Sequence, residues 1–114
     1  MKKVKKKWGS EQWIVNEPEY CGKLMEIFPG HSCSIHFHKN KKETFYILSG
    51  SLLLKLWNTC KGRYKSTVLT KGQALTIKTL VPHTFTNDTD SSCVFIEFSS
   101  HHEDIDSYRL TQSY

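Results

Sequence analysis

The sequence lacks a hydrophobic run that is long enough to cross a bilayer. A membrane-spanning helix needs roughly 20 consecutive apolar residues, and every apolar stretch here is far shorter. The lysine-rich start, MKKVKKKWG, is not followed by an apolar segment, so no secretory signal is predicted. We therefore expect a cytoplasmic protein that has no membrane partner.

Cysteine pairs with the spacing of a metal-binding or redox motif are also missing. The four cysteines, Cys21, Cys33, Cys60 and Cys93, form no CxxC pair. Free thiols are expected in the cytoplasm, some of them buried as small apolar side chains. Cys33 lies three residues before His36, and this odd offset predicts that it lies on the opposite face of a strand.

Charge is in excess only at the amino terminus. The formal net charge is +5, and the first seven residues contain five lysines: Lys2, Lys3, Lys5, Lys6 and Lys7. Without these five lysines the formal net charge of the chain is 5 − 5, or zero. Residues 1–7 are therefore expected to form a basic, flexible tail. Residues 8–114 are long enough for one domain with its own core. No nucleic-acid partner is expected.

Helix signals are scarce, whereas strand signals follow one another between short glycine or Asn/Asp turns. About nine strands are predicted, at 12–16, 23–28, 32–38, 43–49, 52–57, 64–69, 73–77, 83–87 and 93–99. The polar end, 101–114, is expected to be a short helical turn or an extended arm. This pattern predicts an all-β protein, an antiparallel sandwich or barrel.

Two histidines lie two residues apart in the predicted strand 32–38. His36 and His38 therefore share a face, and Glu43 on the next strand can reach them from the side. Two imidazoles and a carboxylate suit a divalent ion, and Zn, Mn, Ni or Fe would each accept them. His83, from a distant strand, is a candidate fourth ligand.

These residues form a pattern that resembles the first motif of the cupin superfamily. Its positions are Gly30, His36, His38, Glu43 and Gly50. Gly72, His83 and Asn87 resemble the second motif, in which Lys78 and Leu80 replace the usual proline and glycine. The resemblance implies a double-stranded β-helix, or jelly-roll sandwich, closed as a small barrel. It also implies a metal inside, held by His36, His38, Glu43 and His83.

Shorter motifs resemble the cupin domain of type II mannose-6-phosphate isomerases. They are Trp8-Gly9-Ser10-Glu11, Phe95-Ile96-Glu97-Phe98, Glu103-Asp104 and Arg109. This resemblance implies aldose–ketose isomerisation of a sugar or sugar phosphate. A homodimer is expected as well. The cupin resemblance implies that the histidine face is the interior one, so four apolar side chains face outward, where a partner would cover them: Ile35, Phe37, Tyr46 and Leu48.

Isomerisation needs a base, and Glu97 and Glu26 are the candidates on predicted strands. Arg109, Lys23 and Lys78 are candidate partners for a substrate phosphate. Two other functions stay open. A free acid facing the metal across a cavity would favour the isomerase over a sugar- or ligand-binding module without turnover, and a wholly apolar pocket would favour an Fe(II)-dependent oxygenase. His31, His101 and His102 have no spacing that recruits them.

Overall fold

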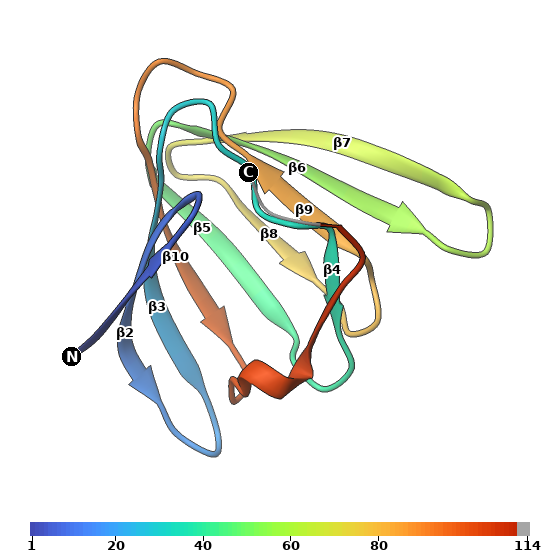
Figure 1. Ribbon diagram of the computed structural model, residues 1–114, viewed down its shortest axis with the longest axis horizontal. Helices are drawn as coiled ribbons and strands as arrows, with labels where there is room; N and C mark the ends of the chain where they lie inside the picture. Colours follow the sequence, from blue (N-terminus) through green and yellow to red (C-terminus); the bar gives the residue numbers. More distant parts are fainter. Residues whose placement is uncertain (112–114) are drawn as a thin grey trace.

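The computed structural model describes residues 1–111, which fold into two antiparallel sheets that face each other (Figure 1). The six-stranded sheet has the order β1 (Lys2–Lys6), β2 (Gly9–Asn16), β3 (Cys21–Ile27), β10 (Cys93–Ser99), β5 (Glu43–Ser49) and β8 (Ala74–Ile77). The five-stranded sheet has the order β11 (Ser107–Arg109), β4 (His36–His38), β9 (His83–Thr86), β6 (Ser51–Asn58) and β7 (Arg63–Thr70). The prediction of an all-β protein is confirmed.

The expected closure into a barrel does not appear as strand pairing. Within residues 1–111, every strand ladder belongs to one sheet or the other, and no ladder joins the two. The chain is a jelly-roll-like sandwich whose two layers meet through side chains. The same described range contains no helix that is long and apolar enough to span a membrane.

Strand alternation builds the core. Phe45 and Ile47 of β5 are fully buried between the sheets, whereas Tyr46 and Leu48 face outward and are more than a third exposed. Phe45, Phe85 and Phe95 pack together with ring centroids 4.7 to 5.9 Å apart. This aromatic cluster joins the two layers, because Phe85 belongs to β9 and the other two rings to the opposite sheet.

The amino terminus differs from the expected flexible tail. Lys2–Lys6 form β1, which pairs with β2 along its whole length. The ammonium group of Lys2 lies 4.3 Å from the centre of the Trp13 ring. The sequence gives little sign of this strand, because its lysines do not alternate with apolar residues. As an edge strand it suits lysine, which discourages pairing with other chains.

The strand that carries the two histidines is shorter than predicted. β4 covers only His36–His38, and Ser32 forms an isolated bridge with Thr86. Cys33 thus lies outside the strand, and the alternation of side chains does not apply to it. It is buried and lines the same pocket as the histidines, so the prediction that it lies on the opposite face is wrong. Burial raises the pKa of its thiol to about 12. All four cysteines are free, as expected.

The carboxyl-terminal segment crosses the open side of β4. A short 3₁₀ helix, η1 (Asp104–Asp106), leads into β11, which pairs with β4. Tyr108 of β11 stacks on Phe37 with ring centroids 5.1 Å apart, so this segment covers part of the outward face of β4. Residues 112–114 of the expected arm lie outside the described residues.

Candidate metal centre and its pocket

Strand pairing brings three histidines together. His36 and His38 share the inner face of β4, and His83 of β9 is the direct register partner of His36. One nitrogen from each ring can be chosen such that all three lie within 4.8 Å of one another. These three residues could therefore hold a metal ion.

The histidines are oriented by backbone carbonyl groups. Each Nδ1 lies against a carbonyl oxygen: 2.8 Å for His36 with Ser34, 3.2 Å for His38 with Asp106, and 2.9 Å for His83 with Val81. A carbonyl oxygen only accepts hydrogen bonds, so each Nδ1 must carry the proton. Each Nε2 is left with a free lone pair, which is the state in which imidazole binds a metal.

Glu43 brings a carboxylate to the same place. Its Oε2 lies 3.1 Å from Nε2 of His38 and 3.8 Å from Nε2 of His83. Glu43 Oε2 and His83 Nε2 are buried, and neither has a hydrogen-bond partner among the described residues. Buried polar atoms are rarely left unpaired. Three lone pairs and a carboxylate that face one another fit a cation, so the residues present suit the divalent metal that the sequence predicts.

The electrostatics agree with this arrangement. Burial and, to a smaller extent, the nearby His83 lower the pKa of His36 to about 3, so the ring is neutral at pH 7. Burial alone would raise the pKa of Glu43, but the ammonium group of Lys41 outweighs it and holds that pKa well below its usual range. His36 and Glu43 are thus in the protonation states that metal ligands need.

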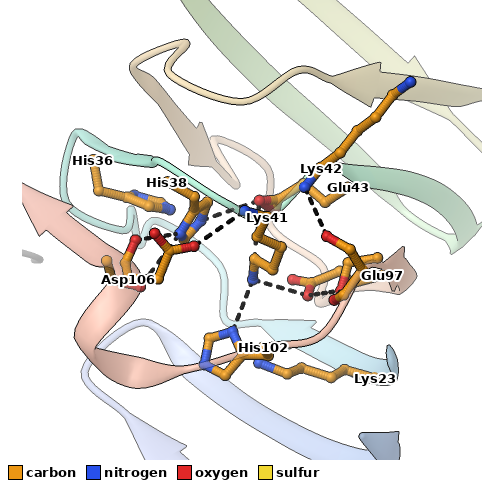
Figure 2. A network of polar contacts seen from close by, with 12 residues as sticks. Lys23, His36, His38, Lys41, Lys42, Glu43, Glu97, His102 and Asp106 are labelled. Carbon is orange, nitrogen blue, oxygen red and sulfur yellow. Dashed lines mark hydrogen bonds and ion pairs between the residues drawn. The ribbon is translucent and has the colours of Figure 1, made fainter. Parts of the chain in front are cut away.

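A buried lysine lies beside these groups. The Nζ atom of Lys41 is 3.1 Å from Glu97 Oε2, 2.9 Å from His102 Nδ1 and 4.0 Å from Glu43 Oε2 (Figure 2). An ammonium group only donates, so His102 accepts at Nδ1 and donates from Nε2 to Asp104, 2.9 Å away. Lys41 therefore connects Glu43 to a second carboxylate and to a histidine.

Asp106 positions this lysine. Its carboxylate accepts the backbone N–H groups of Lys39, Asn40 and Lys41 at 2.9 to 3.2 Å. Its own carbonyl oxygen is the group that accepts from Nδ1 of His38. One buried residue from η1 thus fixes the turn between β4 and β5 and orients one histidine of the site.

The site opens into a cavity of about 300 Å³. His36, His38 and Glu43 lie on its wall, and much of the remaining lining is charged. The Nζ atom of Lys23 lies 3.4 Å from Glu11 and 4.4 Å from the centre of the Trp13 ring. The pocket is therefore not the wholly apolar one that would favour an oxygenase.

The predicted site residues divide into two groups. The four predicted ligands come together, and Glu97, Lys23 and Arg109 line the pocket. Glu26 and Lys78 do not line it. Glu26 lies between the inward-facing Met25 and Ile27, so alternation turns it to the outer face of β3. Lys78 is exposed just after β8.

Several pocket residues were missed by sequence reasoning. Lys41 could have been predicted from the sequence. It lies two residues before Glu43, so the alternation of β5, extended backwards, places it on the same face as Glu43. His102, which follows the end of β10, had no sequence signal. Glu11 stood in the Trp8–Glu11 motif without a predicted role, and it reaches the pocket from β2. Only the packing of β2, β3 and β10 side by side brings these residues to one cavity.

Comparison with known proteins identifies the fold. Capsular polysaccharide assembling protein CapF from Staphylococcus aureus superposes with a TM-score of 0.86 at 20% identity, covering 96% of this chain and 31% of that one. A variant of oxalate decarboxylase from Bacillus subtilis gives a TM-score of 0.84 at 18% identity, covering 96% and 30%. At such identities the likeness shows the fold alone, and this chain spans about a third of either protein.

A second oxalate decarboxylase structure, described for the Mn(II) centres of that enzyme, has a TM-score of 0.83 at 18% identity, covering 96% of this chain and 30% of that one. No curated protein matches this sequence. The family model of the cupin domain, however, matches residues 23–99, which include all four predicted metal ligands. With this match across most of its length, the chain belongs to the cupin domain family.

Proposed function

We propose that this cupin binds one divalent transition metal and transfers a proton on a small hydroxycarbonyl compound, best a sugar or sugar phosphate. The ligands would be His36, His38, Glu43 and His83. One observation carries the proposal: a second buried carboxylate, Glu97, lies in the same pocket and is not part of the ligand set. A free acid beside the metal is what separates an isomerase from a binding module.

The metal part rests on the lone pairs that face one another. Three Nε2 atoms, and a Glu43 Oε2 that has no hydrogen-bond partner among the described residues, face one another and suit a cation between them. A bound divalent ion would supply an electrophile that stabilises negative charge developing in the pocket. Zn, Mn, Ni and Fe all accept this donor set. Mn(II) centres are described for the structurally similar oxalate decarboxylase.

Glu97 is the proposed base. Its Oε2 accepts hydrogen bonds from Nζ of Lys41 at 3.1 Å and from Oγ of Ser99 at 3.3 Å, so the carboxylate is held in one orientation. Aldose–ketose isomerisation removes a proton from one carbon and returns it to its neighbour. Glu97 would carry this proton, while Lys23 and Arg109 supply cations for an anionic group of the substrate.

The kind of substrate is proposed from the comparison with known structures. CapF is described as a capsular polysaccharide assembling protein, which is compatible with a sugar ligand here. The narrower assignment as a mannose-6-phosphate isomerase stays a prediction, as does the cytoplasmic location. The charged pocket disfavours the oxygenase. The binding module remains the competitor, because Lys41 already neutralises Glu97.

Two measurements test the proposal. Elemental analysis should find about one Mn, Zn, Ni or Fe per chain, and a His36→Ala/His38→Ala variant should lose it. In deuterated water, the protein should exchange a carbon-bound proton of mannose 6-phosphate or a related sugar. Glu97→Gln should keep the metal and lose the exchange. Glu26→Gln, the same change on the outer face of β3, should keep both.

The outcomes separate the alternatives. Metal without exchange in any sugar or sugar phosphate would identify a binding module. No metal, even after incubation with each ion, would refute the metalloenzyme. Exchange that survives Glu97→Gln would assign the base to another residue.

A further inference from the structure

The basic residues of the chain are segregated. Between residues 44 and 87 there is no aspartate or glutamate, but there are six basic residues: Lys55, Lys61, Arg63, Lys65, Lys71 and Lys78. The zero net charge outside the first seven residues hides this asymmetry. The fold places four of the six on one hairpin, β6–β7.

This hairpin extends away from the rest of the molecule (Figure 1). Its strands pair out to Asn58 and Arg63, and β7 is the edge strand of its sheet. Six of the eight residues of β7 are exposed. No residue of the hairpin, 51–70, lines the metal pocket, so the hairpin is a separate surface.

Two aromatic side chains lie among these cations. Trp57 and Tyr64 are cross-strand partners with ring centroids 5.2 Å apart, and Tyr64 is 54% exposed. The ammonium group of Lys55 lies 5.2 Å from the centre of the Tyr64 ring. Arg63 and Lys65 flank Tyr64 in β7 and are exposed, but strand alternation turns their side chains to the opposite face of the hairpin. Protection of the sheet edge explains the lysines but not an exposed aromatic ring among them.

We infer that the β6–β7 hairpin binds single-stranded nucleic acid. Proteins that bind such strands combine cations, which contact the phosphates, with aromatic rings, on which the bases stack. The hairpin offers both, with no acidic residue nearby in the sequence to repel the phosphates. A membrane fits poorly, because the tip, Asn58-Thr59-Cys60-Lys61-Gly62, has no large apolar side chain to insert. An acidic polysaccharide would match the charge but has no bases to stack.

The test is the binding of a labelled oligothymidylate to the full chain, followed by fluorescence anisotropy at several salt concentrations. With four phosphate contacts, the logarithm of the binding constant should fall with the logarithm of salt with a slope of about −3. Lys61→Gln/Arg63→Gln/Lys65→Gln should weaken binding about tenfold or more and flatten the slope. The matched control, Lys2→Gln/Lys3→Gln/Lys5→Gln in β1, removes the same charge and should change binding little.

A second pair of variants tests stacking. Tyr64→Ala should weaken binding about tenfold, whereas Tyr64→Phe should keep it, because only the ring is needed. These positions are exposed, and thermal melting and metal content check that each variant folds. The inference is overturned by absent binding, by equal effects of the two triple variants, or by tighter binding of heparin that Tyr64→Ala leaves unchanged. The last result would assign the surface to an acidic polysaccharide.

Discussion

Lys41 is a buried cation beside two carboxylates and a histidine. Lys41→Met would leave Glu97 and Glu43 buried without their counter-ion, so we expect a loss of roughly 3–5 kcal/mol in the free energy of unfolding. Lys42→Met, at the exposed neighbouring position, should change it by less than about 0.5 kcal/mol. Urea unfolding of the metal-free protein measures both. Equal losses would show that the ion pair contributes no net stability.

The buried histidines predict how stability changes with pH. Burial lowers the pKa of His36 to about 3, against about 6.5 in the unfolded chain. Below pH 6.5 the unfolded state therefore binds a proton that the folded state does not. This histidine lowers the stability as pH falls from 6.5 to 3, by up to about 1.4 kcal/mol per pH unit.

Unfolding of the metal-free protein at pH 7, 6 and 5 checks this expectation. Burial also lowers the pKa of His83 and His102, which gives the same sign. A His36→Gln variant should show a shallower loss than the wild type. Stability that stays constant from pH 7 to 5 in the wild type would contradict the prediction.

Among the elements, the turn between β8 and β9 contains a strained backbone conformation. Leu80 has a φ of 67°, in the left-handed region, and stands where the second cupin motif usually has glycine. Its backbone N–H donates to the carbonyl oxygen of His38 at 2.7 Å, which holds the turn beside the metal site. The altered motif therefore keeps a geometry that favours glycine, and His83 still reaches the other ligands.

Leu80→Gly should relieve this strain. A left-handed conformation costs a non-glycine residue roughly 1–2 kcal/mol. Glycine avoids this cost, but part of the gain is lost because glycine loses more backbone entropy on folding. The leucine side chain is 59% exposed, so little packing is lost. We expect the free energy of unfolding to rise by about 0.5–1 kcal/mol in urea unfolding. Thr79→Gly, at a neighbouring position without left-handed backbone, should lower it; a loss at Leu80 as well would refute the strain.

The strands differ in how well the sequence predicts them. The alternating burial of β5 follows from the period of a strand, and Tyr46 and Leu48 lie on its outer face as predicted. β1 was missed because a run of lysines has no alternation to recognise; pairing with β2 makes it a strand. β4 was predicted too long, and Cys33 was placed on the wrong side as a consequence.

For the whole molecule, the outer face of the six-stranded sheet predicts a homodimer. Tyr46, Leu48 and Phe98 are 37 to 53% exposed on adjacent strands β5 and β10, and no strand or helix within residues 1–111 covers them. Phe98→Glu should convert the dimer to a monomer in analytical ultracentrifugation. Val68→Glu, on the exposed strand β7, should leave the dimer intact. A monomeric wild type would contradict the prediction.

The sequence by itself determined what depends on neighbours along the chain. Strand alternation placed His36 and His38 on one face, and the spacing to Glu43 brought the carboxylate within reach. Only the tertiary structure decided what depends on contacts between distant strands. Lys41 contacts Glu97 of β10 and His102, which follows that strand. Glu11 of β2 pairs with Lys23 of β3, and Asp106 of η1 holds the turn between β4 and β5. These contacts join residues up to 67 positions apart, so no local pattern along the sequence reveals them.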